Sequence, residues 1–141
     1  MIINLDVYDK IYHILRNYLQ TESQFNPIVT KEAQMQSDKF PLVVITEENN
    51  SFSVGTTKLE ETRSKVEYEI NIYTTDTIKN NKTISKIKIA KELKELIDNL
   101  MNCNLKMRRT LCRPTPNLDI NIYRVTMRYS SNINDNTGKI F

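Results

Sequence analysis

Val66-Glu67-Tyr68-Glu69-Ile70-Asn71-Ile72-Tyr73 is the stretch that decides the fold of this 141-residue chain. Every second residue from Val66 to Ile72 is apolar, and the residues between them are polar. Strict alternation over eight residues predicts a β-strand with one face in the core and the other in water or against a partner. We therefore expect a sheet that is covered on one side.

Two segments that flank this strand carry the period of an amphipathic helix. In the first, apolar residues recur at three- and four-residue steps from Tyr8 to Leu19, and the helix is expected to end within residues 21–24. For the second, we expect Thr83 to be the N-cap. Its predicted apolar stripe is Ile84, Ile87, Ala90, Leu93, Ile97 and Leu100.

Four further strands are predicted around the deciding one. Residues 40–45 are apolar on both faces, which is typical of a covered strand, and a turn at residues 48–51 would lead to a hairpin partner at 51–57. A basic strand from residue 105 should stop at Pro114. The last strand is expected from Asp119 to Tyr129, with a one-residue phase shift that predicts a bulge. Residues 24–39 and 74–81 are predicted to be connections without regular structure.

The order of these elements predicts an α+β fold in a single domain over residues 1–131, followed by a tail over 132–141 that forms an interface. The expected architecture is a mixed or antiparallel sheet of about five strands, with both amphipathic helices packed on one face. The chain carries a formal charge of +3 and has neither a secretory signal nor an apolar run of membrane-spanning length. We expect it to be made in the cytoplasm, with no membrane partner.

No set of residues suited to catalysis stands out. His13 is the only histidine and has no local partner, while Cys103 and Cys112 are nine residues apart, which fits no zinc or redox motif. A phosphate-binding loop would need more glycines than Gly55 and Gly138. The prediction is a protein that is not an enzyme, with no cofactor and no metal.

Charge is concentrated in the C-terminal strands, where residues 103–128 hold six basic residues and one acid. This segment could bind phosphates, with Tyr123 and Tyr129 stacking on single-stranded bases, which would make the chain a small nucleic-acid-binding module. The interpretation that we favour pairs the arginines with glutamates across strands or across a subunit interface. The arginines concerned are Arg108, Arg124 and Arg128.

Glu67 and Glu69 lie on one strand face and could hold a divalent cation, as in metal-dependent nucleases. In the usual nuclease layout a lysine follows the acid, whereas here Lys65 precedes both glutamates. A solvated face or a subunit contact is therefore the favoured interpretation of this pair.

Three stretches carry a resemblance to a known family: the Phe-Pro strand at 40–45, the alternating strand at 66–73, and a Tyr-x-x-Thr-x-x-Tyr pattern at 123–129. Together with the element order over residues 4–130, they resemble the tail terminator, or tail completion, proteins of long-tailed bacteriophages and of phage-tail-like bacteriocins. Head–tail connector or stopper proteins share this architecture and are the alternative.

The resemblance implies a structural role. Six copies would form a ring that caps the head-proximal end of the tail tube, stops its polymerisation and offers a surface to the head or collar. The implied partners are further copies, the tail tube protein, the sheath and head–tail connector proteins, in a virion or tail-like particle. DNA would be present only as content of the lumen.

Two groups of residues are assigned on this basis. The long polar loop, which the fold hardly needs, is the expected tube-facing element: Gly55, Thr57, Lys58, Glu60, Glu61, Arg63 and Lys65. The expected subunit interface combines the charged strand residues with the apolar tip of the tail: Glu67, Glu69, Arg108, Arg124, Arg128, Ile140 and Phe141.

Overall fold

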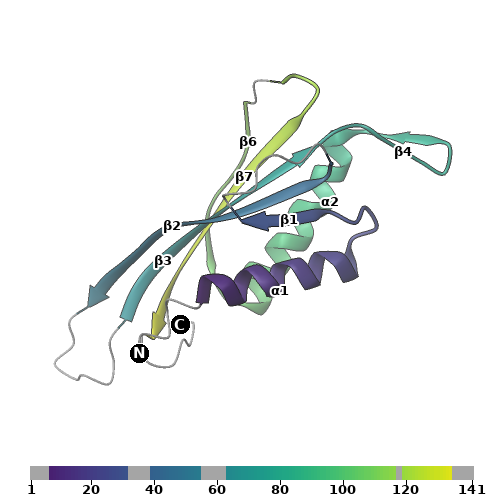
Figure 1. Cartoon of the computed structure of the whole chain (residues 1–141). Helices are drawn as coiled ribbons and strands as arrows, with labels where there is room; N and C mark the ends of the chain where they lie inside the picture. Colours follow the sequence, from purple (N-terminus) through teal and green to yellow (C-terminus); the bar gives the residue numbers. More distant parts are fainter. Residues whose placement is uncertain (1–6, 32–38, 55–62, 117–118, 135–141) are drawn as a thin grey trace.

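A computed structural model of the chain describes residues 7–31, 39–54, 63–116 and 119–134. Two helices and seven strands are found in these ranges (Figure 1). In chain order they are α1 (Val7–Glu22), β1 (Ile28–Lys31), β2 (Leu42–Val54), β3 (Arg63–Thr74), β4 (Thr77–Lys79), β5 (Lys82–Ile84), α2 (Lys86–Asp98), β6 (Arg108–Thr115) and β7 (Tyr123–Asn134). A π-helical segment, Asn99–Asn104, extends α2 toward β6.

Five of the strands form one mixed sheet in the order β1-β2-β3-β7-β6. β1 is parallel to β2, and the other pairs are antiparallel. The deciding stretch lies in β3, the central strand, so it has a partner on both sides. β4 and β5 form a separate two-stranded hairpin. The predicted α+β class is confirmed.

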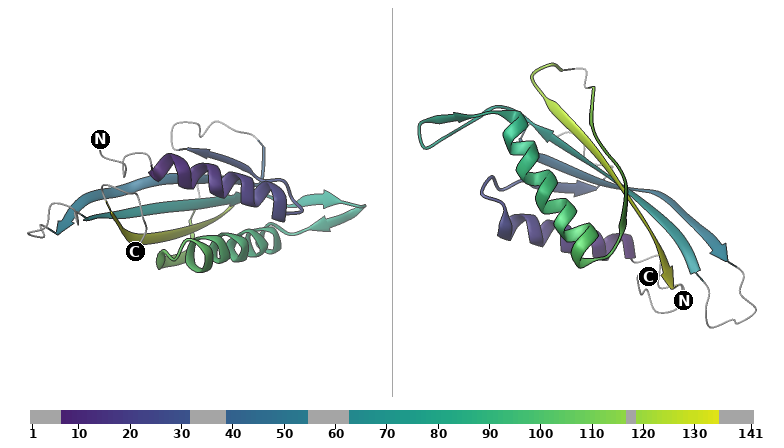
Figure 2. Two further views of the ribbon diagram at one scale, coloured as in Figure 1. Left: turned by 90° about the horizontal axis from the view of Figure 1, so that it is seen from below. Right: turned by 180° about the vertical axis from the view of Figure 1, so that it is seen from behind.

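Both helices pack on the same face of the sheet (Figure 2), as predicted. From α1 the buried residues are Val7, Ile11, Leu15 and Leu19, one per turn. α1 is also hydrogen-bonded to the sheet, because the Tyr8 hydroxyl donates to the Ile45 carbonyl at 2.7 Å. The alternation of β3 fits this arrangement, since Val66, Tyr68, Ile70 and Ile72 have no exposed surface and belong to the same core.

The start of α2 differs from the prediction. Thr83 lies in β5, and Ser85 is the N-cap, with its side chain accepting a hydrogen bond from the Lys88 backbone N–H. The predicted apolar stripe began at Ile84, which is a strand residue, and therefore included Ile87. Ile87 is 58% exposed, and Ile89 is buried instead. The later members of the stripe, Ala90, Leu93, Ile97 and Leu100, are buried as expected.

The connections also contain structure that the sequence did not predict. Residues 24–39 include β1, and residues 74–81 include β4 together with a tight turn at Asn80 and Asn81, both at positive φ. The turn predicted at 48–51 is wrong, because β2 continues through it to Val54. Register shifts at Glu47/Asn49 and Phe52/Val54 mark the irregularities that allow this.

Both C-terminal strands lie further along the chain than predicted, because β6 starts at Arg108 and β7 at Tyr123. β6 passes through Pro114, which an edge strand tolerates because one row of its N–H groups has no partner. The phase shift near residue 122 is not a bulge: it marks the start of β7, and the irregularity lies in β6 between Arg109 and Leu111. β7 reaches Asn134, so it extends three residues into the segment predicted as a tail.

Candidate functional site: the helix-free face of the sheet

One face of the five-stranded sheet carries neither of the two described helices, and the predicted interface residues of the strands lie on it. Glu67 and Glu69 alternate with the core residues of β3, so they point away from the helices. On β7, Arg128 is the register partner of Glu69 and Arg124 that of Tyr73, and Arg108 of β6 is opposite Ser130 of β7. We call this surface the helix-free face. Ile140 and Phe141 lie outside the described residues.

One end of the helix-free face is apolar and partly covered by the chain itself. Leu42, Val44 and Tyr73 form a small buried cluster. Phe40 and Ile122, which approach from the connections at this end, pack against it. The apolar end is therefore closed, and the part of the face open to a partner is the polar remainder.

A buried polar network occupies the middle of the face. The Asn71 side-chain oxygen accepts hydrogen bonds from the Thr126 hydroxyl at 2.7 Å and from Arg124 Nε at 3.0 Å. Thr126 also bonds the hydroxyl of Thr115 on β6 at 2.5 Å, and the Arg124 guanidinium lies 5.4 Å from the centre of the Tyr73 ring. Arg124 is thus held within the chain, and the network joins β3, β7 and β6.

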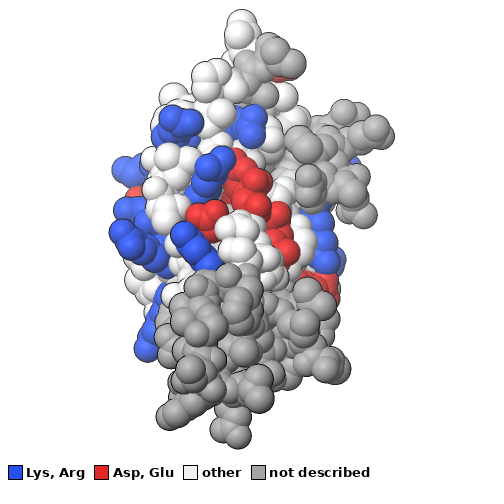
Figure 3. All heavy atoms as spheres, turned by 90° about the vertical axis from the view of Figure 1, so that its left-hand side faces the viewer, with Lys and Arg blue, Asp and Glu red and all other residues white. Residues whose placement is uncertain are grey.

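Acidic residues come next along the face. Glu67 and Glu69 are two residues apart on β3, opposite Asn49 and Thr46 of β2, and Glu48 is at the register shift between Glu47 and Asn49. The Glu48 and Glu69 carboxyl groups share a hydrogen bond, which lowers the pKa of Glu48, whereas burial and then this bond raise the pKa of Glu69. We call Glu48, Glu67 and Glu69 the acidic patch; Figure 3 shows acidic side chains gathered on one side of the molecule with Lys and Arg around them.

The interpretation of Arg–Glu pairing across strands is confirmed for Arg128, whose Nη2 lies 3.8 Å from Glu69 Oε2. A second pair links β6 to α2, because Arg109 Nη1 lies 3.2 Å from Asp98 Oδ2. Asp98 also accepts a hydrogen bond from the Tyr129 hydroxyl at 2.8 Å, which raises the pKa of that phenol in addition to its burial. These contacts anchor the end of α2 to the sheet.

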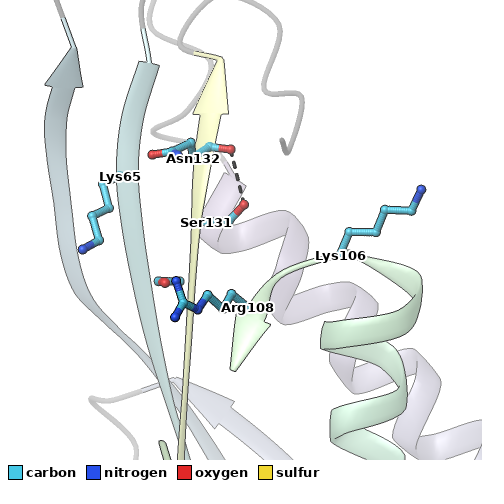
Figure 4. Close-up of a pocket in the computed structure, with 6 residues that line it drawn as sticks. Lys65, Lys106, Arg108, Ser131 and Asn132 are labelled. Atoms are coloured by element: carbon cyan, nitrogen blue, oxygen red, sulfur yellow. Dashed lines mark hydrogen bonds between the residues drawn. The ribbon is translucent and has the colours of Figure 1, made fainter. Parts of the chain in front are cut away.

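A hollow of about 380 Å³ opens at the far end of the face (Figure 4). Arg108 reaches across β7 toward the side where Lys65 projects from β3, and Ser130 and Asn132 lie between them. Lys106 contributes to the rim but points to the opposite side (Figure 4). We call the hollow formed by Lys65, Arg108, Ser130 and Asn132 the basic notch.

The tube-facing loop is only partly described. Its residues Gly55, Thr57, Lys58, Glu60 and Glu61 lie outside the described residues. Arg63 and Lys65, also predicted as loop residues, belong to β3, so this part of the prediction is wrong. The loop joins the paired ends of β2 and β3, which form the longest hairpin of the sheet.

The predicted stacking surface for bases is not formed by the two tyrosines. Tyr129 has no exposed surface and lies in the helix-covered core, and Tyr123 packs against the same core. Both residues alternate in phase with Val125 and Met127 along β7, so their rings are on the side of the sheet that the helices cover. Glu48 was predicted to lie in a turn and is instead a residue of β2. The one available signal was that strand-forming residues stand on both sides of it, at 40–45 and 51–57.

Both outer strands of the sheet carry features that discourage pairing with another strand. The carbonyl of Val29 on β1 accepts a hydrogen bond from the Tyr12 hydroxyl at 3.2 Å, and Lys31 is ion-paired with Asp9 of α1. β6 has Pro114, which lacks an N–H, and an irregularity after Arg109. Beyond Ile45, where β1 ends, β2 is interrupted by its own two register shifts. Such features are typical protection against edge-to-edge association.

The described residues form neither a metal site nor a membrane-spanning helix. The described ranges hold no group of three or more His, Cys, Asp or Glu side chains placed to bind a metal. Neither described helix combines the length and the apolar character that crossing a bilayer requires. His13 is exposed on α1, with Nε2 3.5 Å from Asp9 Oδ2. Neither a scan against models of known protein families nor a comparison with curated protein sequences gives a match to this chain.

Proposed function

We propose that this chain is a structural subunit of a phage tail or of a phage-tail-like bacteriocin. Copies of it, six if the ring matches the family that the sequence resembles, close around an axis on the head-proximal end of the tail tube and stop its polymerisation. The observation that carries the proposal is the helix-free face, which presents charged groups of both signs on an open sheet surface. Such a surface suits contact with another protein.

The protected strands of the sheet support the same function. A protein that ends the growth of a polymer must bind the last subunit without offering an equivalent surface itself. β1 is capped by Tyr12, and β6 contains Pro114, so neither outer strand is a good template for a further strand. Residues 55–62, which connect β2 to β3 in the sequence, are the proposed tube-facing element.

Electron microscopy tests this proposal directly. Purified protein is mixed with tail tubes polymerised from the tube protein encoded in the same genome. We expect rings of this chain at one tube end and tubes that stop lengthening. Tubes that keep growing with bare ends would contradict the proposal, and rings that bind a connector protein but not the tube would indicate the connector function instead.

A deletion tests the loop assignment in the same assay. Removing residues 56–61 should leave folding and ring formation unchanged and abolish attachment to the tube. The deletion stops before Arg63 because β3 begins there, and the next residue, Ser64, is buried. Circular dichroism checks the fold, and normal capping by this variant would exclude the loop as the tube-facing element.

A further inference from the structure

The helix-free face carries charges that a single copy of the chain does not balance. In the acidic patch, Arg128 is the one cation within 4.0 Å of a carboxylate among the described residues, and it reaches only Glu69. Glu48 and Glu67 have no ion-pair partner in the described ranges. The hydrogen bond between the two carboxyl groups lowers the pKa of Glu48, so it favours the charged form of that residue, while burial and the same bond raise the pKa of Glu69.

The basic notch has the opposite surplus. Lys65 and Arg108 are both exposed, and neither forms an ion pair within the described part of the chain. Ser130 and Asn132 add a hydroxyl and an amide between them. A guanidinium and an ammonium next to neutral donors are the groups that proteins use to bind a carboxylate or a phosphate.

No ion pair within 4.0 Å joins the notch to the patch in the described residues. Glu67, Ser130 and Arg108 lie in one row across β3, β7 and β6. The backbones of the two charged residues are thus two strand spacings apart, about 10 Å. Lys65 and Glu67 are two residues apart on the same face of one strand, about 7 Å.

We propose that the basic notch is a carboxylate-binding site and that its ligand is the acidic patch of a second copy of this chain. Each copy offers one notch and one patch next to each other on the same face, so two copies related by a two-fold axis can each place their notch on the patch of the other. The inference rests on the proposed function in that it supplies one contact between copies of the chain.

The position of the acidic patch favours a protein carboxylate over a nucleic acid as the ligand. A phosphate backbone that enters the notch would extend over neighbouring parts of the same face. Glu67 lies in the same cross-strand row as Arg108, and Glu69 is the next acid on β3. These glutamates would repel a nucleic acid that extended beyond the notch. The acidic patch of a second copy has basic groups beside it, so it complements both the notch and the glutamates next to the notch.

Charge reversal with complementation tests this contact. One variant reverses the notch (Lys65→Glu with Arg108→Glu), and a second reverses the patch (Glu48→Lys with Glu67→Lys). We expect each to weaken self-association about tenfold or more, as measured by sedimentation velocity. Mixed in equal amounts, the two variants should assemble again, because every contact between unlike copies then joins opposite charges. Raising the salt concentration should weaken the wild-type assembly.

Matched controls separate this contact from general charge effects. Lys88→Glu with Lys91→Glu makes the same change in net charge on the exposed side of α2 and should assemble like the wild type. Thermal unfolding followed by circular dichroism checks each fold. If reversal of the notch prevents folding, the neutral pair Lys65→Gln with Arg108→Gln replaces it, with weaker assembly as the expected result.

Several results would overturn the inference. They are a wild-type protein that stays monomeric at micromolar concentration, full assembly by either reversed variant alone, or folded variants that do not assemble when mixed. Loss of binding to an oligonucleotide in the notch variant, with unchanged self-association, would assign the notch to phosphates and overturn it too. If the mixed variants assemble but neither they nor the wild type cap tail tubes, the proposed function fails and the carboxylate site stands.

Discussion

At the scale of single residues, the helix-free face is organised by Asn71. Its side-chain oxygen accepts hydrogen bonds from both Thr126 and Arg124, and it is only 6% exposed. Removing this buried acceptor would leave Arg124 Nε without its acceptor and the Thr126 hydroxyl with Thr115 as its one remaining side-chain partner among the described residues. The polar middle of the sheet therefore contributes to stability as well as to a surface.

Replacing Asn71 by alanine should lower the free energy of unfolding by about 1–3 kcal/mol, because the Thr126 hydroxyl loses an acceptor in a buried position. Urea denaturation measures the change. The exposed Asn102→Ala variant serves as the control and should stay within about 0.5 kcal/mol of the wild type. Equal stability of the two variants would show that water replaces the Asn71 oxygen at no loss.

Glu47 predicts a dependence on pH. It is paired with Tyr68 across β2 and β3, and burial raises the pKa of its carboxyl above the ordinary 4.5, while a hydrogen bond from Asn50 opposes the shift. A carboxyl with a raised pKa in the folded state binds more protons when folded. Its stabilising contribution is therefore present below about pH 4.5 and lost as the pH rises through the folded pKa.

We accordingly expect the stability of the Glu47→Gln variant relative to the wild type to be higher at pH 7 than at pH 4. The urea midpoints of both proteins at the two pH values measure this difference. Among the described residues the buried Tyr68 hydroxyl has no hydrogen-bond partner, so it does not stabilise the Glu47 carboxylate by donating to it. Glu95→Gln, on the exposed side of α2, is the control. An identical effect of the Glu47 substitution at both pH values would argue against a raised pKa.

At the scale of elements, the start of α2 shows how a local pattern can indicate the wrong residue. Both Thr83 and Ser85 are good N-cap residues, and either could precede the apolar period. Pairing of β4 with β5 takes Thr83 into a strand opposite Ile78, so the helix starts after Ser85. Asp76 adds a second tie, because its carboxylate accepts a hydrogen bond from the Lys86 backbone N–H at 2.8 Å.

The two candidates for the cap are separated by a pair of alanine substitutions. Ser85→Ala should destabilise the protein by about 1 kcal/mol, because the Lys88 N–H loses its acceptor, whereas Thr83→Ala should change little. Thermal or urea unfolding of both variants is the measurement. A larger loss in Thr83→Ala would contradict the assignment of the cap.

At the scale of the whole molecule, solubility depends on the exposed backbone edges of the outer strands of the sheet. Pro114 and the charged Arg113 lie on β6, the outer strand next to β7. Replacing both by threonine would give a flatter strand with a complete row of N–H groups. We expect this variant to aggregate faster than the wild type on mild heating, followed by light scattering and thioflavin fluorescence.

Pro116→Thr, just beyond the end of β6, is the matched control and should aggregate at the wild-type rate. Unchanged aggregation of the double variant would mean that Pro114 and Arg113 do not protect the sheet, and the support that the outer strands lend to a chain-terminating function would be lost.

The sequence by itself determined the elements whose evidence is local. The alternation from Val66 to Tyr73 specified a strand and both of its faces, and the apolar period over residues 8–19 specified α1, because periods of 2 and 3.6 residues act within a single segment. The α+β class and the placement of both helices on one face follow from elements that each have a single face to bury.

Only the tertiary structure decided what depends on partners far away in the chain. β1 is four residues long and becomes a strand because β2 is beside it, and Glu48 joins the acidic patch because the register of β2 on β3 shifts there. Arg128 meets Glu69, and Arg108 comes to lie across β7 from Glu67, through strand pairings between residues 22 (Arg108 and Ser130) to 63 (Glu67 and Ser130) positions apart. Such contacts are set by packing and register, for which a local pattern carries no signal.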